Sequence, residues 1–399
     1  MKESRIFYLF LLGFSWLFIW LYGGKVPYTF FYVILLMPVV SALHAGMVYL
    51  WFKYRQQVSS KFVMKGDTVE YELEINNEDF FLYPYLTIHF SGIDTYYGGQ
   101  FQSQRFSLEP YSRKKWCFPI ECKYRGYYEL GLKRVEICDV LGLFTFRYNV
   151  FEPIFITVYP KTVRLDRFRL VSRLISERNS LLYNMQEDRI NISYIRDYLY
   201  GDKLNNIHWK LTAKTGKLKV KTYESTSRDD VVLLLDLKKN HYAVEQNVAL
   251  EDKVIEGAIA VAHYCIRNWI PVRLLYYQEG IAEINVKSPV DFEDFYKLLA
   301  TVKFNGDTDL NNIIEIFLGT HPDKTNVVIV TSNMSYDIYG QINNMKLSGF
   351  EVSLLYIYPE DISLIDIEEV DRILSKLPEI RVDTYKVCVN DDIKSILER

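Results

Sequence analysis

The sequence predicts a membrane-anchored protein of several domains: an N-terminal hairpin of two transmembrane helices, a β-sandwich, and an α/β domain with a mostly parallel sheet. Three patterns carry this prediction. Two long stretches near the N-terminus lack charged residues, the next region alternates apolar and polar residues, and the C-terminal half alternates apolar runs with helical periodicity. The predicted parts are the hairpin at 1–55, the sandwich at 56–160, a basic linker at 161–200, and the α/β part at 201–399.

The hairpin is predicted from two apolar stretches. Residues 6–24 contain no charged residue, and residues 26–52 contain no Lys, Arg, Asp or Glu. A transmembrane helix needs about 20 apolar residues, so we expect two spans, at about 6–24 and 28–52. A cleaved signal peptide is disfavoured, because Trp16 and Trp20 occupy positions near its end where a cleavage site requires small residues.

The distribution of basic residues predicts the orientation of the hairpin. Lys2 and Arg5 precede the first span, Lys53 and Arg55 follow the second, and Lys25 alone lies between them. The positive-inside bias therefore places both termini and the soluble domains in the cytoplasm. Five scattered cysteines without a C-x-x-C pair also fit a reducing compartment.

The β-sandwich is predicted from alternation with a period of two. Val69, Tyr71, Leu73 and Ile75 alternate with glutamates, as in an antiparallel strand with one face in water. Similar alternation follows at 116–122 and 154–158. Short strands separated by turn residues indicate an immunoglobulin-like sandwich.

The α/β domain is predicted from apolar runs typical of strands buried on both faces. Val231–Leu235 is the first such run, and a segment with helical spacing follows it, from Ile255 to Ile266. Further strands are expected at 272–277, 326–330 and 352–357. Strands that alternate with helices imply a largely parallel sheet.

Two connecting segments leave alternatives open. The segment from Lys161 to Arg178 holds six basic residues, which would bind anionic lipid headgroups, lie on a solvated helix, or pair with acidic groups elsewhere in the chain. Residues 201–221 read GDKLNNIHWKLTAKTGKLKVK. They predict a turn, a short helix at 207–214 that ends at Thr215-Gly216, and an edge strand at 218–221, unless the segment is only a solvated connector.

The same segment resembles the signature of a bacterial protein family. The resemblance rests on Ile195–Tyr198, Gly201-Asp202, Ile207–Lys210, Ala213–Leu218 and Val220-Lys221, and it extends to Arg125–Gly131, Asp139–Phe144 and Val158–Pro160. These residues resemble the domain of unknown function 58 family. Asn205 and Asn206 stand where the family usually carries arginines, which weakens an anion-binding role.

The resemblance implies a location, a partner and a set of site residues. Family members are often found beside MoxR-type AAA+ ATPases, so such an ATPase is the expected partner, and the bacterial cytoplasmic membrane is the expected location. Trp209 is expected to pack the segment onto the α/β domain, and Asp202 and Lys210 to fix its turn or contact the partner. The expected signature or interaction residues are Arg196, Asp197, Gly201, Asp202, His208, Trp209, Lys210 and Lys214. His208 is expected to be packed or hydrogen-bonded.

The resemblance also implies a von Willebrand factor A-like C-terminal domain, whose Mg²⁺ site begins with an Asp-x-Ser-x-Ser turn. Here Lys238 and Asn240 replace the two serines that follow Asp236. Thr308 would supply a further ligand, but it serves equally well as a helix cap. Asp236 and Thr308 are therefore degenerate candidates, no tightly bound Mg²⁺ is expected, and the ammonium group of Lys238 is expected to pair with Asp236.

The predicted function is that of a membrane-anchored, non-enzymatic assembly or adaptor protein that acts with the ATPase in envelope-related or protein-maturation processes. No H-E-x-x-H, G-x-S-x-G, Walker or G-x-G-x-x-G motif is present. The net charge of −3 argues against nucleic-acid binding. The alternatives are a Mg²⁺-dependent von Willebrand factor A-type binding module and an enzyme of undetected type. Client, pathway and oligomeric state stay open.

Overall fold

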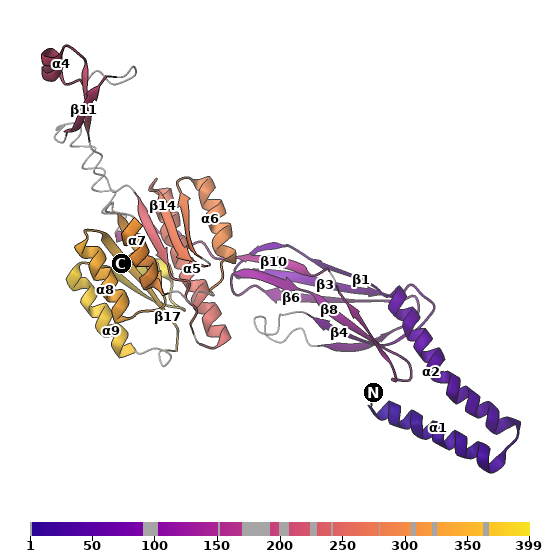
Figure 1. Ribbon diagram of the computed structural model, residues 1–399. Helices are drawn as coiled ribbons and strands as arrows, with labels where there is room; N and C mark the ends of the chain where they lie inside the picture. The colour runs from indigo at the N-terminus through magenta and orange to yellow at the C-terminus, as the bar shows by residue number, and fades with distance from the viewer. Residues whose placement is uncertain are drawn as a thin grey trace. The chain divides into compact units, whose positions relative to one another are not determined.

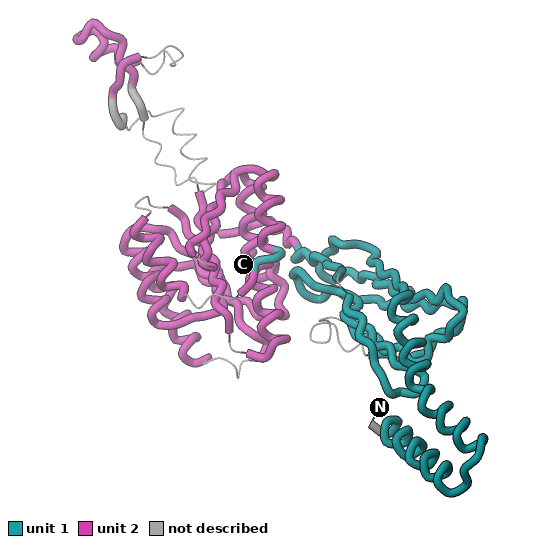
Figure 2. The backbone as a smooth tube through the Cα atoms, turned by 45° about the vertical axis from the view of Figure 1, so that its right-hand side comes forward, with its two compact units in different colours: residues 1–161, 300–302 teal, residues 162–299, 303–399 magenta. Residues whose placement is uncertain are grey.

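The described part of the chain forms two compact units. The computed structural model describes residues 2–90, 103–150, 152–169, 192–198, 207–223, 230–240, 242–278, 280–304, 309–320, 325–361 and 367–399. One unit comprises residues 1–161 with 300–302, and the other residues 162–299 with 303–399 (Figure 2).

The first unit begins with a helical hairpin. Helices α1 (Lys2–Tyr22) and α2 (Lys25–Trp51) lie side by side and turn at Gly23 and Gly24 (Figure 1). Both helices are long and apolar enough to cross a membrane. The two apolar helices predicted from the sequence are therefore present.

A proline inside α2 is compensated by the other helix. Pro38 lacks an N–H group, so the carbonyl of Ile34, four residues earlier, loses its helical partner. The hydroxyl of Tyr8 in α1 donates a hydrogen bond to that carbonyl at 3.1 Å. This bond keeps a backbone acceptor satisfied where a bilayer would offer no water.

Ten strands follow α2 and belong to three sheets, ordered β1-β3-β6, β2-β10-β7 and β5-β4-β8-β9. The pairings are antiparallel except for β2 with β10. The strands are β1 (Lys53–Val58), β2 (Phe62–Met64), β3 (Thr68–Asn76), β4 (Tyr83–Phe90), β5 (Gln104–Leu108), β6 (Arg113–Glu121), β7 (Gly126–Leu130), β8 (Leu132–Cys138), β9 (Thr145–Asn149) and β10 (Ile154–Tyr159).

One apolar core joins these sheets. The alternating residues of β3 predicted to face inward, from Val69 to Ile75, are all fully buried. They cluster with inward-facing residues of β4, β8 and β10. The end of α2 belongs to the same core, because Val48 is buried in it and the ring of Phe52 lies 5.3 Å from that of Tyr148. The end of α2 and the strands therefore share one apolar core.

The second unit contains a six-stranded mixed sheet with helices. Its strands are β13 (Val231–Leu235), β14 (Val272–Tyr277), β15 (Ile281–Val286), β16 (Asn326–Thr331), β17 (Glu351–Tyr358) and β18 (Asp383–Cys388). Its helices are α5 (Val244–Arg267), α6 (Pro289–Thr301), α7 (Leu310–Thr320), α8 (Tyr336–Leu347), α9 (Ile367–Lys376) and α10 (Ile393–Leu397), with a 3₁₀ turn at Leu377–Ile380.

The sheet is doubly wound. Its order is β15-β14-β13-β16-β17-β18, with only β15 antiparallel to its neighbour. Leu354 and Tyr356 of β17 belong to the core formed with α7, α8 and α9. Leu355 and Ile357 point to the opposite face, where a Cβ on Gly257 of α5 would lie 2.7 Å from Leu355. Helices therefore cover both faces, and the strand order reverses between β13 and β16, where such sheets place ligands.

The start of the expected basic linker packs onto the second unit. Leu165 and Phe168 are each 1% exposed, and the ring of Phe168 lies 5.4 Å from that of Tyr385. Asp166 accepts from the ammonium group of Lys394 at 2.6 Å. Arg169 pairs with Asp383 at 3.5 Å. Of the alternatives stated for this segment, pairing with acidic groups applies to Arg169, while residues 170–191 lie outside the described part.

Candidate functional site

The expected site residues gather in a small structure, here named the signature module (residues 192–198 and 207–223). Strands β11 (Ile192–Asp197) and β12 (Lys219–Tyr223) pair antiparallel and are accompanied by α4 (Trp209–Thr215). The predicted short helix and edge strand are therefore present, with bounds shifted by one or two residues. Gly201 and Asp202 lie outside the described residues.

Local hydrogen bonds fix α4 on the strand pair. The backbone N–H of His208 donates to the carbonyl of Lys219 at 2.7 Å. The Nδ1 atom of His208 accepts from the N–H of Leu211 at 3.1 Å and so caps the helix. Gly216, with φ of 67°, ends the helix in the left-handed conformation that glycine tolerates best. His208 is thus used as a cap, which gives it a structural role.

Among the described side chains of the module, Ile207 and Val220 are buried. They pair across an isolated bridge and are 4% and 3% exposed. Trp209 is 64% exposed. Trp209 is therefore not part of the module's buried core, and its expected packing onto the α/β domain stays a prediction. The sequence pattern around a seven-residue helix marks Ile207 and Trp209 as equally apolar and cannot tell which of them the strand pair covers.

The surface of the module combines an aromatic ring with exposed positive charge. Lys210 and Lys214 are exposed and stand four residues apart, so they share one face of α4. Lys217 and Leu218 are also exposed. No acidic residue lies between residues 207 and 223. An exposed tryptophan beside a basic helix face is suited to an acidic partner surface, since tryptophan is enriched at binding hot spots.

One charge pair joins the two strands of the module. The ammonium group of Lys219 lies 2.8 Å from Asp197, and this hydrogen bond and charge lower the pKa of the Asp197 carboxyl. Arg196 donates to the carbonyl of Asp197 at 3.2 Å. Lys219, which was not among the expected site residues, is therefore the partner of Asp197. Strand register alone pairs these two positions, so alternation across a hairpin would have revealed the contact.

The second candidate region is the Asp236 cluster (Asp236, Lys238, Asp309, Thr331 and Asn333), at the carboxyl ends of β13 and β16. Asp236 is buried, and its Oδ2 accepts from the Thr331 hydroxyl at 2.6 Å and the Asn333 amide at 3.0 Å. Its Oδ1 accepts from the backbone N–H of Lys238 at 3.0 Å. Burial raises the pKa of Asp236, against the opposing effect of these hydrogen bonds.

The ammonium group of Lys238 does not pair with Asp236. It pairs with Asp309, which precedes α7, so the expected Lys238–Asp236 pair is wrong. The side chain of Asn240 bonds instead to the Ser332 hydroxyl at 2.9 Å. Thr308 lies outside the described residues. The expectation used nearness in sequence, whereas Asp309 is 71 residues away and is brought to Lys238 by the fold.

The Asp236 cluster does not fit Mg²⁺. The ion requires several free oxygen ligands in octahedral geometry, but both oxygens of Asp236 already accept hydrogen bonds and a lysine lies beside them. No group of three or more His, Cys, Asp or Glu side chains could hold a metal among the residues that the structure describes.

We therefore expect no change in the melting temperature of the full chain in millimolar Mg²⁺ or Mn²⁺. A ligand that binds only the native state must raise stability by mass action. The measurement is differential scanning fluorimetry in detergent, with and without EDTA. A saturable stabilisation that is absent in Asp236→Asn would contradict this expectation.

Comparisons with known proteins support the family that the signature suggests. A family model described as "Protein of unknown function DUF58" matches residues 194–354. None of the curated proteins matches the chain.

Solved structures show low similarity. The CARDB domain of the PF1109 protein from Pyrococcus furiosus is 15% identical, with a TM-score of 0.18, over 27% of this chain and 93% of that one. A beta-glucosidase from Listeria innocua is 11% identical, with a TM-score of 0.15, and the match spans 27% of this chain and only 16% of the enzyme. These TM-scores support no argument on fold or function.

Proposed function

We propose that this protein is a membrane-anchored, non-enzymatic adaptor whose signature module binds an acidic surface of a partner protein. The observation that carries the proposal is the exposed Trp209 beside Lys210 and Lys214 on a capped helix. Among the described side chains of the module, the buried ones are Ile207 and Val220, and Trp209 is not one of them. An exposed tryptophan without a packing role is best explained by binding.

The partner that we propose is a MoxR-type AAA+ ATPase, in line with the family resemblance. The hairpin would hold the protein in the bacterial cytoplasmic membrane, with its soluble units on the cytoplasmic side, where the ATPase finds its nucleotide. The basic flanks of the hairpin support this orientation. The adaptor would present clients to the ATPase in envelope-related or protein-maturation processes.

A Mg²⁺-dependent von Willebrand factor A-type binding module is the second candidate. The doubly wound strand order and the place of Asp236 at the point where this order reverses favour it. The hydrogen-bond donors around Asp236 disfavour a bound cation, as described above. An A-like domain that binds proteins without a metal is compatible with both observations.

The proposal predicts that Trp209→Ala separates binding from stability. Its affinity for the purified ATPase should fall by about 30-fold or more, since loss of a hot-spot tryptophan costs about 2 kcal/mol or more. The melting temperature should stay within about 2 °C of the wild type, because the side chain is exposed. Biolayer interferometry with the full chain in nanodiscs measures the affinity.

Trp269→Ala is the matched control. Trp269 is 75% exposed and lies outside the signature module, so its loss should leave the affinity unchanged. Equal effects of the two variants, or wild-type affinity in Trp209→Ala, would refute the role of the module. Raising the salt concentration should weaken the wild-type complex, because exposed lysine contacts are screened.

A further inference from the structure

The loop between β8 and β9 (residues 139–144, the β8–β9 loop) is hydrogen-bonded to both helices of the hairpin. Asp139 is fully buried, and its carboxylate accepts from the Ser41 hydroxyl of α2 at 2.6 Å. The guanidinium group of Arg5 in α1 donates twice to the carbonyl of Leu143, at 3.1 and 2.9 Å. Gly142 has φ of 71°, and a Cβ on it would lie 3.0 Å from Ser4. The loop is therefore held at a fixed level along the hairpin.

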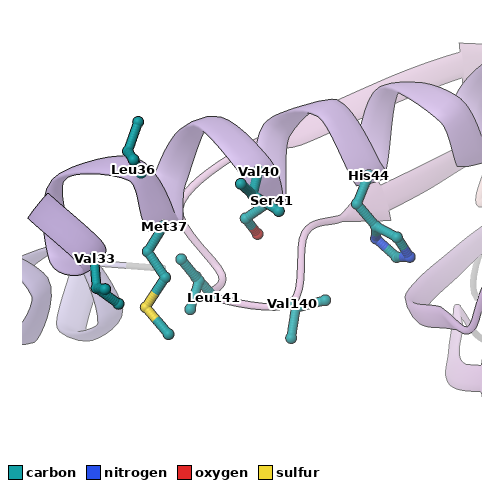
Figure 3. A pocket seen from close by; sticks show the side chains of 8 residues that line it. All are labelled: Val33, Leu36, Met37, Val40, Ser41, His44, Val140 and Leu141. Atoms are coloured by element: carbon teal, nitrogen blue, oxygen red, sulfur yellow. The ribbon is translucent and has the colours of Figure 1, made fainter.

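The outer side of this loop is apolar. Val140 is 53% exposed and Phe144 is 41% exposed. Together with α2, the loop borders a groove of about 530 Å³, in which Figure 3 shows Met37 and Ser41 turned toward the loop. The groove is lined by Val33, Leu36, Met37, Val40, Ser41, His44, Val140 and Leu141. Its one hydroxyl, that of Ser41, is already bonded to Asp139, and the lining is otherwise apolar except for His44.

The level of the loop along the hairpin places it within a bilayer. Ser41 is 16 residues from Lys25, the first residue of α2, which is about 24 Å along a helix. Arg5 is 17 residues from Tyr22, the last residue of α1, which is about 26 Å. The hydrocarbon core of a bilayer is about 30 Å thick. A hairpin that spans the membrane thus brings the β8–β9 loop to the edge of the hydrocarbon, on the side of the N-terminus.

Several backbone N–H groups of the β8–β9 loop donate to acceptors within the loop itself. Asp139 accepts from the N–H groups of Leu141 at 3.3 Å and Phe144 at 2.8 Å. The N–H of Gly142 donates to the carbonyl of Asp139 at 3.0 Å. The N–H of Asp139 donates to the carbonyl of Phe144 at 3.2 Å. A loop in contact with lipid must satisfy its polar groups internally, because no water reaches them. The carboxylate of Asp139 accepts two of these four hydrogen bonds, and backbone carbonyls of the loop accept the other two.

We propose that the β8–β9 loop is inserted into the leaflet on the side of the N-terminus, and that the acyl chain of a bilayer lipid fills the groove between this loop and α2. The inference rests on the membrane insertion of the hairpin proposed above. The groove is continuous with Leu36 and Val40, which are 57% and 64% exposed on the helix that would span the bilayer. The sheet-rich part would then be held at the membrane by the loop as well as by the end of α2.

Site-directed spin labelling of the full chain in phospholipid vesicles tests this proposal. Single cysteines replace Leu36 in the hairpin, Val140 in the loop and Lys123 as a control, in a chain carrying Cys117→Ser and Cys388→Ser. The other three cysteines are at most 8% exposed and would not be labelled. Lys123 is exposed beyond Glu121, the end of β6 that pairs with Thr68. Thr68 is eight residues, about 27 Å along β3, from Asn76, which pairs with Lys53 next to α2.

The measured quantity is the accessibility of each nitroxide to oxygen, which concentrates in lipid, and to a water-soluble nickel chelate. We expect the ratio of oxygen to nickel accessibility at Val140 to exceed that at Lys123 several-fold. It should lie below the ratio at Leu36, which is 11 residues, about 17 Å, from Lys25 and therefore nearer the bilayer centre. A label at Val140 that behaves like Lys123, while Leu36 is in lipid, would refute the loop insertion and leave the hairpin intact. A label reached by neither reagent would mean that protein fills the groove, and a water-exposed Leu36 would refute the insertion of the hairpin itself.

Discussion

Replacing Phe168 by alanine is expected to lower the free energy of unfolding of the second unit by about 3–5 kcal/mol, the usual range for a large aromatic residue in a core. The side chain is 1% exposed, and its ring lies near those of Tyr264 and Tyr385, at 6.4 and 5.4 Å. The cavity left by alanine would lie between the start of the linker and the sheet. The melting temperature should fall by roughly 6–20 °C for a unit of this size, as measured by circular dichroism of the full chain in detergent.

Arg167→Ala is the matched control for this prediction. Arg167 is adjacent and exposed, and such surface changes usually stay within about 0.5 kcal/mol. A small effect of Phe168→Ala, similar to that of Arg167→Ala, would show that the segment does not pack on the second unit in solution.

Asp236→Ala is expected to destabilise the same unit by about 2–4 kcal/mol. The change leaves the Asn333 amide and the N–H of Lys238 without the acceptor they share, whereas the Thr331 hydroxyl keeps the carbonyl of Asn333 at 2.8 Å. Each unsatisfied buried donor costs about 1–3 kcal/mol. Removing the carboxylate also removes the cost of burying its charge, which offsets part of this loss. Asp309→Ala is the control, because it removes only the half-exposed partner of Lys238 and should cost at most about 1 kcal/mol.

The raised pKa of Asp236 adds a pH dependence with a definite sign. The folded state binds the proton more tightly than the unfolded state, so this carboxyl contributes a loss of stability as pH rises from the ordinary aspartate pKa, about 3.9, through the raised value. The stability of the wild type relative to Asp236→Asn should therefore fall with increasing pH over this interval and then level off. Urea denaturation at several pH values measures it, and the opposite slope would contradict the assignment.

The sequence was most informative where a pattern is long and its physical cause is local. Two uncharged stretches sufficed for the apolar helices, and the alternation from Val69 to Ile75 identified β3. The continuous apolar run Val231–Leu235 identified the central strand β13, which is buried on both faces. Each of these patterns follows from the environment of a single element, so no contact distant in sequence was needed to recognise it.

The errors arose where a side chain depends on a distant partner. Lys238 was assigned to the carboxylate nearest in sequence, but the doubly wound sheet brings the start of α7 to it. Phe168 was read as part of a basic linker, because the arginines around it dominate the composition and the aromatic surface of Tyr264 and Tyr385 is known only after folding. Within the module, the two strands cover Ile207 and leave Trp209 exposed, a choice that the apolar pattern alone does not reveal.

The pairing of Ile192 with Tyr223 has an evolutionary consequence. The chain enters and leaves the signature module at two paired positions, which lie about 5 Å apart in an antiparallel ladder. Ends this close let a segment be exchanged for another of different length at little cost in loop closure. Such a segment can therefore be gained or lost as one block of about thirty residues without a change in the doubly wound sheet.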